Sequence, residues 1–143
     1  MTSSIFPGNT DRTTLSAKLR LDGIGLHSGS PSSATLSPGK SGIRIIDGGR
    51  GVPLKDITVA RTPRCTRLEL PSGRRIDMVE HLLAALRVTG ITDLDIDFQG
   101  DEVPVLDGSS SVWLSAIRAT RTVGLSGPVD CLVVMEETFF EIG

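Results

Sequence analysis

The chain has 143 residues, enough for one domain with a hydrophobic core and too few for two of ordinary size. Its formal net charge of −2 and its aromatic content of 3% argue against nucleic-acid binding, which relies on basic surfaces and stacking rings. No apolar run reaches the roughly 18 residues of a membrane span, and residues 1–14 lack the basic and apolar regions of a signal peptide. We therefore expect a soluble, cytoplasmic protein with no membrane span and no nucleic-acid partner.

The first part of the chain predicts short strands. Residues 1–13 are mainly polar and without period, which indicates a flexible lead-in. From Leu15 to Leu21 apolar and polar residues alternate, as in a strand with one buried face. Residues 52–60 are less regular and are expected to cross the domain. Further short strands, forming an antiparallel meander, are predicted at 33–37, 43–46 and 64–70.

A glycine-rich segment follows the first predicted strand and contains a histidine: Gly23-Ile24-Gly25-Leu26-His27-Ser28-Gly29. Three glycines allow positive φ angles and close approach of another chain segment or a ligand. The Gly-x-Gly-x-x-Gly spacing and a following helix are both missing, so we reject a dinucleotide site.

The clearest helical pattern begins after a turn at 71–73 and contains the adjacent pair Glu80-His81. Asp77 is the expected N-cap, which places both residues in the first turn. The positive end of the helix dipole favours a carboxylate there and biases His81 towards the neutral form that a metal ligand requires. Glu80 lies opposite and His81 on the flank of the apolar stripe, which is formed by Met78, Val79, Leu82, Leu83 and Leu86.

Two simpler interpretations of this pair stay open on spacing alone. Asp77-x-x-Glu80 is close to a capping box, in which Glu80 would bond to the backbone of Asp77. A single histidine such as His81 is also common as a hydrogen-bonded boundary residue. Because position 85 is Ala85, the helix cannot supply two zinc ligands one turn apart, so any metal needs ligands from elsewhere.

Two charged groups have a structural and a functional interpretation. An exposed strand face best explains the basic cluster, and an anionic ligand is the second explanation; its members are Arg61, Arg64, Arg67, Arg74 and Arg75. After Gly90 a strand alternates Leu94, Ile96 and Phe98 with Asp93, Asp95 and Asp97. We interpret these acids as a solvated face, because carboxylates along a straight strand diverge and lack the loop carbonyls of a calcium site.

The C-terminal part predicts a second helix and an unfinished unit. A serine-capped helix is expected around 110–119, followed by a linker at 122–128. Residues 129–135 read as an apolar strand, and 128–143 as the first strands of an incomplete second domain. Cys65 and Cys131 are far apart and in no paired motif, so two buried thiols are expected. Residues 14–127 then form one α+β domain, a two-layer sandwich of a mainly antiparallel sheet with two helices.

Three motifs in order closely resemble the N-terminal half of the UDP-3-O-acyl-N-acetylglucosamine deacetylases of lipid A biosynthesis. They are the glycine segment 23–29, Val79-Glu80-His81-Leu82-Leu83-Ala84-Ala85-Leu86, and Glu102-Val103-Pro104-Val105-Leu106-Asp107-Gly108-Ser109. Cys65-Thr66 before the helix also fits, and the match runs from about Thr14 to the C-terminus. Family proteins have two similar domains that hold zinc and substrate between them.

The resemblance implies a zinc-dependent amide hydrolase acting on a UDP-linked acylated amino sugar. His81 would be a zinc ligand, and Glu80 would be the general base that takes a proton from zinc-bound water. The loop around Asp107 would be structural. His27 belongs to a family signature, but its chemistry alone assigns it no role.

The chain also departs from the family pattern. The other zinc ligands and a further catalytic histidine belong to the second domain, and Met78 stands where the family typically has threonine. The remaining nitrogen and sulfur donors are His27, Cys65 and Cys131, and no spacing places them beside His81. We therefore expect the isolated chain to be inactive, with a C-terminal half polypeptide or self-association completing it. The alternative is a non-enzymatic binding or regulatory module that retains the fold.

Overall fold

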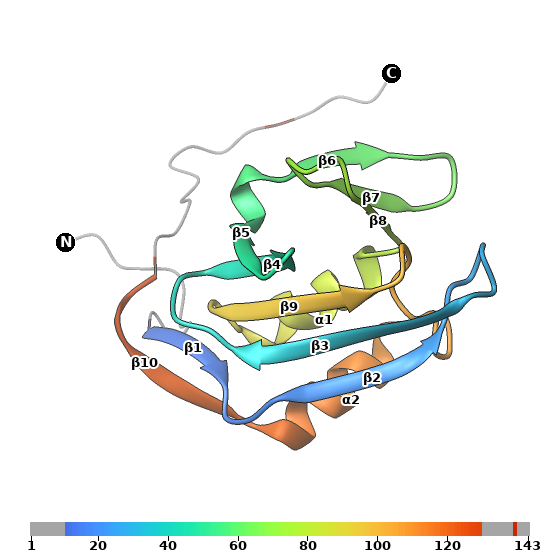
Figure 1. Ribbon diagram of the computed structural model, residues 1–143. Helices are drawn as coiled ribbons and strands as arrows, with labels where there is room; N and C mark the ends of the chain where they lie inside the picture. Colours follow the sequence, from blue (N-terminus) through green and yellow to red (C-terminus); the bar gives the residue numbers. More distant parts are fainter. Residues whose placement is uncertain (1–10, 130–138, 140–143) are drawn as a thin grey trace.

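The computed structural model describes residues 11–129 and residue 139, and its centre is a five-stranded sheet with two helices on one face (Figure 1). All neighbouring strands in this sheet are antiparallel except β9 and β4, which run parallel. The strands, in spatial order, are β2 (Leu19–Ile24), β3 (Pro31–Pro38), β9 (Leu94–Gln99), β4 (Ile43–Asp47) and β5 (Arg50–Pro53).

Apolar residues at alternate positions of the central strands form the core. Leu36 of β3 and Ile45 of β4 both lie opposite Ile96 of β9, and all three side chains are fully buried. The helices α1 (Glu80–Thr89) and α2 (Ser111–Thr120) pack against each other and cover this face. They bury Leu82, Ala85 and Leu86 from α1 and Trp113 and Ile117 from α2.

Two smaller sheets complete the described part of the chain. In one, β1 (Asp11–Leu15) pairs antiparallel with β10 (Thr122–Pro128), joining segments far apart in sequence. The other is an antiparallel sheet above the main one in Figure 1, preceded by a short 3₁₀ helix, Leu54–Asp56. Its strands are β6 (Thr58–Arg61), β7 (Thr66–Glu69) and β8 (Arg75–Asp77).

The α+β class and the sandwich of a mainly antiparallel sheet with two helices are confirmed. The antiparallel meander is not, because β9 inserts between β3 and β4. The strand predicted from Leu15 to Leu21 is divided at residues 16–18, where Ala17 is exposed and the chain passes from the β1–β10 sheet to the main sheet.

Predictions about three connecting segments need correction. The linker predicted at 122–128 is β10, which is a strand despite its exposed side chains because its backbone pairs with β1. The lead-in predicted for 1–13 ends earlier, since β1 begins at Asp11, and its residues 1–10 lie outside the described residues. The turn at 71–73 leads into β8 rather than directly into a helix.

Other expectations have mixed outcomes. Ser110 holds the N-cap position of α2, but its side chain makes no capping bond, and Ser109 Oγ instead accepts from the Ser111 amide. The strand predicted at 129–135, and Cys131 within it, fall outside the described residues apart from Val129. Neither helix of the described chain is long and apolar enough to cross a membrane.

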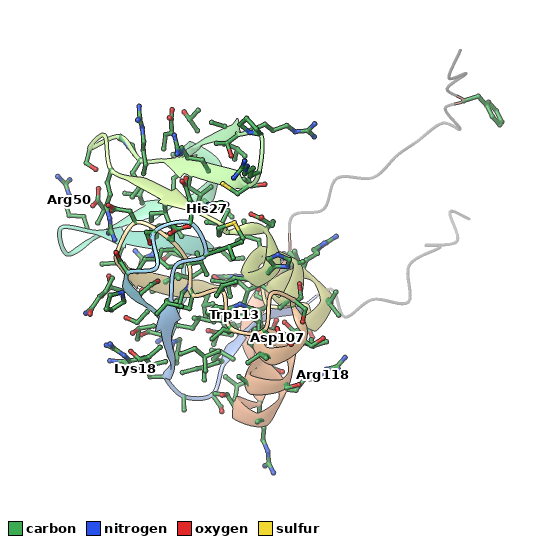
Figure 2. The ribbon with its side chains drawn as sticks, turned by 90° about the vertical axis from the view of Figure 1, so that its right-hand side faces the viewer. Lys18, His27, Arg50, Asp107, Trp113 and Arg118 are labelled. Carbon is green, nitrogen blue, oxygen red and sulfur yellow. The ribbon has the colours of Figure 1, made fainter. Side chains whose placement is uncertain are left out.

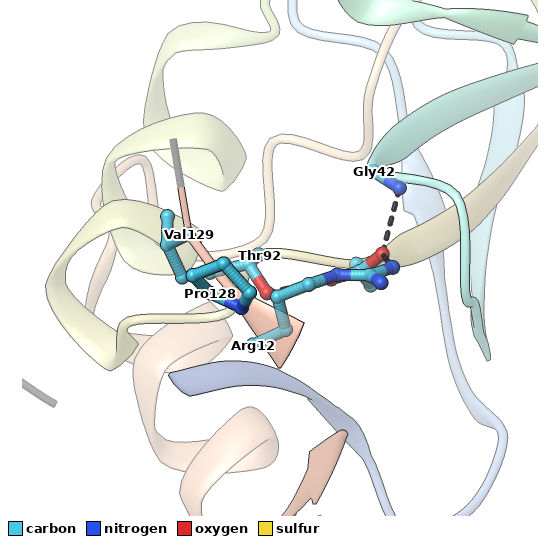
Figure 3. A pocket seen from close by; sticks show the side chains of 6 residues that line it. Arg12, Gly42, Thr92, Pro128 and Val129 are labelled. Atoms are coloured by element: carbon cyan, nitrogen blue, oxygen red, sulfur yellow. Dashed lines mark hydrogen bonds and ion pairs between the residues drawn. The ribbon is translucent and has the colours of Figure 1, made fainter. Parts of the chain in front are cut away.

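The acids before and along β9 do not form one solvated face. Asp97 is exposed as expected, but Asp95 pairs with Arg44 at 2.7 Å, and the Asp93 side chain is only 1% exposed. Figure 3 shows Arg12 and Gly42 in the wall of a cavity whose volume is about 330 Å³. The Arg12 guanidinium and the Gly42 amide both donate to the Asp93 carboxylate. Thr92 Oγ1 also donates to this carboxylate at 2.7 Å. The alternating sequence pattern therefore did not reveal that Asp93 is buried and paired with Arg12.

Candidate active site

Glu80 and His81 are the first two residues of α1, and the helix begins later than the sequence suggested. Val79 holds the N-cap position, and Asp77, predicted to be the cap, ends β8 instead. The Asp77 carboxylate binds Arg67 through two hydrogen bonds of 2.6 and 2.8 Å. The capping-box alternative is therefore wrong, because the backbone geometry places no cap at Asp77 and Glu80 is not the third helical residue.

The Glu80 carboxylate is oriented from outside its own helix. Its Oε2 atom accepts a hydrogen bond of 3.1 Å from the Thr66 backbone amide at the start of β7. Oε1 makes no hydrogen bond within the described residues. One oxygen is thus fixed by the backbone, and the other is left for a ligand or a water molecule.

The two residues before the N-cap of α1, Asp77 and Met78, have a constrained backbone. Met78 has φ 65°, in the left-handed region that costs a non-glycine residue on the order of 1 kcal/mol or more. Its neighbour Asp77 is held by two backbone bonds of 2.9 Å, from its amide to the Asp101 carbonyl and from the Val103 amide to its own carbonyl. These pairs, together with the Arg67 ion pair, fix the direction in which Glu80 and His81 leave the sheet.

The glycine segment forms a loop that encloses a buried carboxylate. Glu102 Oε1 accepts from the His27 amide at 3.0 Å and Oε2 accepts from the Ser28 amide at 2.8 Å. His27 Nδ1 lies 3.1 Å from Glu102 Oε1. The predicted close approach of another segment is confirmed, because a Cβ on Gly25 would lie only 2.2 Å from Glu102 Oε2.

A cavity of about 290 Å³ lies beside this loop, lined by His27, Asp77 and the turn that contains Cys65. Thr62 Oγ1 contacts the Cys65 thiol at 3.0 Å, and the side chain of Cys65 is half-buried rather than fully buried as expected. Thr66, the next residue, donates its backbone amide to Glu80, so the turn that lines this cavity is also hydrogen-bonded to the start of α1.

The loop that carries Asp107 approaches the same region. Figure 2 looks onto the end of the molecule at which His27 and Asp107 both lie. Hydrogen bonds from the backbone and hydroxyl of Ser109 lower the pKa of the Asp107 carboxyl, and the nearby charge of His81 adds to this effect. Asp107 therefore lies near enough to His81 for their charges to interact.

The basic cluster is largely paired within the protein. Arg67 binds Asp77, Arg75 lies 3.3 Å from Glu69, and Arg74 donates to the Phe98 carbonyl at 2.6 Å. Arg61 and Arg64 are exposed. The cluster therefore serves mainly to connect strands, and its role towards an anionic ligand stays a prediction.

The side chains at this site fit only part of a zinc centre. A catalytic zinc takes about three protein ligands. Within residues 11–129 and 139, no group of three His, Cys, Asp or Glu side chains could hold a metal ion. The structure brings Glu80 and His81 together at one helix start but does not bring His27 or Cys65 into a common ligand set with them. Sequence reasoning placed Glu102 in a family motif but gave it no role, and the glycines of the loop signalled only that some chain segment or ligand approaches closely.

Comparisons with known proteins agree with the three sequence motifs. The model of the family LpxC, UDP-3-O-acyl N-acetylglycosamine deacetylase, matches residues 12–142. Three relatives are named UDP-3-O-acyl-N-acetylglucosamine deacetylase. The proteins of Thermosynechococcus vestitus and Aquifex aeolicus are each 35% identical to this chain; the alignments cover 89% and 90% of this chain and 46% and 45% of the relatives. The protein of Brucella melitensis is 34% identical, over 80% of this chain and 42% of the relative. The chain thus spans less than half the length of these curated relatives. Because the family model covers nearly all of it, the chain belongs to the UDP-3-O-acyl N-acetylglycosamine deacetylase family.

Proposed function

We propose that this chain is the N-terminal half of a zinc-dependent deacetylase that hydrolyses the acetamide of UDP-3-O-acyl-N-acetylglucosamine in lipid A biosynthesis. The observation that carries the proposal is the family match over residues 12–142, together with Glu80 and His81 side by side at the start of α1. The relatives bear the deacetylase name, and the chain spans less than half of their length, which supports its assignment to one half of such an enzyme.

Glu80 would act as the general base. General bases need an acceptor atom free to reach the proton they remove. The Thr66 amide fixes Oε2, so the carboxylate has one preferred orientation and Oε1 is the oxygen for the attacking water. The constrained entry at Met78 supports this role, because it limits how far the first turn of α1 can shift.

His81 would supply one zinc ligand, and the remaining ligands would come from the second half. When bound, zinc supplies the Lewis acidity that activates an amide for hydrolysis. Since the described residues hold no three-ligand group, we assign them no step through the metal. Their part is to hold one imidazole and one carboxylate next to each other at a helix start.

Reconstitution tests the proposal. The chain is co-expressed with the C-terminal half of a family member, and release of acetate from UDP-3-O-acyl-N-acetylglucosamine is measured. We expect activity in the pair, and a loss of roughly 100-fold or more with Glu80→Gln, since general-base catalysis contributes about 10²–10⁴-fold. Glu69→Gln is the matched control, because Glu69 pairs with Arg75 on the small sheet. Full activity in Glu80→Ala would remove the base assignment.

Metal content gives an independent check. The chain alone is expected to bind zinc weakly, because one imidazole and one carboxylate leave the coordination incomplete. The measurement is the zinc content after dialysis, with and without the second half. One tightly held zinc per isolated chain, lost in His81→Ala, would contradict the need for a second half.

A further inference from the structure

Glu102 is a buried carboxylate for which the proposed chemistry has no use. Its side chain is only 7% exposed, and each oxygen accepts one backbone N–H of the glycine loop, from His27 and from Ser28. Among the described residues no lysine or arginine pairs with it. Burial by itself raises the Glu102 pKa, but the hydrogen bonds from Ser28 and His27 outweigh burial and lower it.

The same carboxylate also lies beside the His27 ring. Nδ1 lies 3.1 Å from Glu102 Oε1, and because a carboxylate can only accept hydrogen bonds, a proton on Nδ1 avoids two acceptors facing each other. In the neutral ring Nε2 is then the acceptor. The His27 side chain is 36% exposed and lines the cavity beside Cys65, so this nitrogen belongs to a ring that ligands can reach.

Glu102 also belongs to the segment that constrains the entry to α1. Its neighbours Asp101 and Val103 make the two backbone bonds to Asp77. The backbone of this segment therefore holds the approach to Glu80, while its one buried side chain holds the loop of His27. A change at Glu102 should act on the His27 side without breaking the Asp77 bonds.

We propose that Glu102 is a positioning residue that keeps neutral His27 in the Nδ1–H tautomer, with Nε2 presented to accept a hydrogen bond from a hydroxyl or N–H of the substrate. The orientation of the ring is a property of this chain alone. Its use by a sugar substrate rests on the proposed function.

The geometry around Glu102 requires a carboxylate and not merely a polar group. With glutamine at 102, one backbone N–H would face an amide NH₂, so donor would meet donor. Alanine at position 25 would displace the carboxylate while keeping its charge, because its Cβ would lie 2.2 Å from Oε2 and 2.4 Å from Ser28 Oγ. The two substitutions therefore separate loss of charge from loss of position.

Nitrogen NMR of the ¹⁵N-histidine-labelled full chain, at a pH where the rings are neutral, measures the tautomer directly. The chain has 2 histidines, so a His81→Asn spectrum assigns the signals. We expect a protonated Nδ1 for His27 in the unchanged chain and its loss in both Glu102→Gln and Gly25→Ala. Matched controls are Glu69→Gln and Gly124→Ala, because Glu69 lies on another sheet and a Cβ at Gly124 meets nothing within 4 Å.

The spectrum of the unchanged chain alone tests which nitrogen of His27 carries the proton, whether or not the variants fold. A neutral His27 with its proton on Nε2 would overturn the proposal. So would a folded Glu102→Gln protein that keeps the Nδ1–H tautomer, since Glu102 would then be only structural. These measurements need no turnover, so a failed reconstitution would count against the deacetylase proposal and leave the His27 assignment standing.

Discussion

Two buried carboxylates flank β9, and the chain satisfies them in different ways. Asp93, just before the strand, is held by the guanidinium of Arg12, by Thr92 and by the Gly42 amide. Glu102, after the strand, is held by two backbone amides and by the ring of His27. The first has a permanent cation as partner, whereas the second has neutral donors and a histidine ring that can change its protonation.

This difference separates a structural site from a functional one. The Arg12–Asp93 pair joins β1 to the start of β9 and is neutral as a unit at any ordinary pH. Glu102 holds a histidine at the edge of a cavity, near the turn that orients Glu80. A permanent ion pair suits a position that must not change, and a carboxylate–histidine pair suits one that has to present a ring to a ligand.

The largest effect on stability should come from removing the structural carboxylate. Asp93→Ala removes the acceptor of the Gly42 amide and of the Arg12 guanidinium, and hydrogen bonds to a charged group are worth about 1.5–3 kcal/mol each. Urea unfolding measures the loss. Asp97→Ala is the control, because Asp97 is an exposed aspartate in β9. Its unfolding free energy should change by no more than about 0.5 kcal/mol. Equal losses in the two variants would refute the buried pair.

Acid should weaken the same site in a defined pH range. Burial raises the Asp93 pKa, but hydrogen bonds from Arg12, Thr92 and Gly42 outweigh it and lower the pKa to about 2. Against an ordinary value near 3.9, this corresponds to about 2.5 kcal/mol of stability. Because the folded-state pKa is depressed, that stability is fully present above about pH 4–5 and is lost as the pH falls towards 2. The measurement is the unfolding free energy between pH 6 and pH 2, where Asp93→Asn should show a shallower decline.

Replacing the second carboxylate should cost less. Glu102→Gln keeps the side-chain volume and one acceptor, so the expected loss is about 1–2 kcal/mol, the cost of a buried polar group left unpaired. Urea unfolding beside Asp93→Asn places the two sites on one scale. If Glu102→Gln is the more destabilising of these isosteric changes, the division into a structural and a functional carboxylate is wrong.

The smallest effect is expected at Glu80. In Glu80→Gln the remaining carbonyl oxygen can still accept the Thr66 amide, so stability should change by less than about 1 kcal/mol. Thermal unfolding of the chain tests this directly. A loss above about 2 kcal/mol would show that the charge of Glu80 is needed for folding, which would weaken its assignment as a base.

Alternation of polar and apolar side chains predicted most of the buried strands. Strands with mainly exposed side chains, which only backbone hydrogen bonds hold in place, were missed. The buried row of Leu36, Ile45 and Ile96 follows directly from alternation. Residues 122–128 have mostly exposed side chains, so nothing in their pattern showed that they pair with β1. The parallel neighbours β4 and β9 were equally hidden, because strand order depends on contacts distant in sequence.

The sequence was sufficient to name Glu80 and His81 as site residues, but not to predict where their helix begins or what surrounds them. The adjacent Glu80 and His81 stood out against the apolar stripe, and the structure places them together at the start of α1. The start itself was misplaced, because Asp77 has the residue type of a cap but is committed to Arg67. Glu102 could not be recognised from its neighbours, since only the folded glycine loop reveals that a carboxylate fills it.

Pairing of β1 with β10 also has a consequence for how the molecule folds. Thr13 lies opposite Gly124, so this small sheet closes a loop of most of the chain. Contacts between distant segments slow folding, because loop-closure entropy is lost before the contact forms. During synthesis the main sheet can assemble as soon as β9 emerges, while β1 has to wait for β10. Strand β1 is thus expected to be among the last to acquire protection from hydrogen exchange, although it precedes the other described strands in the chain.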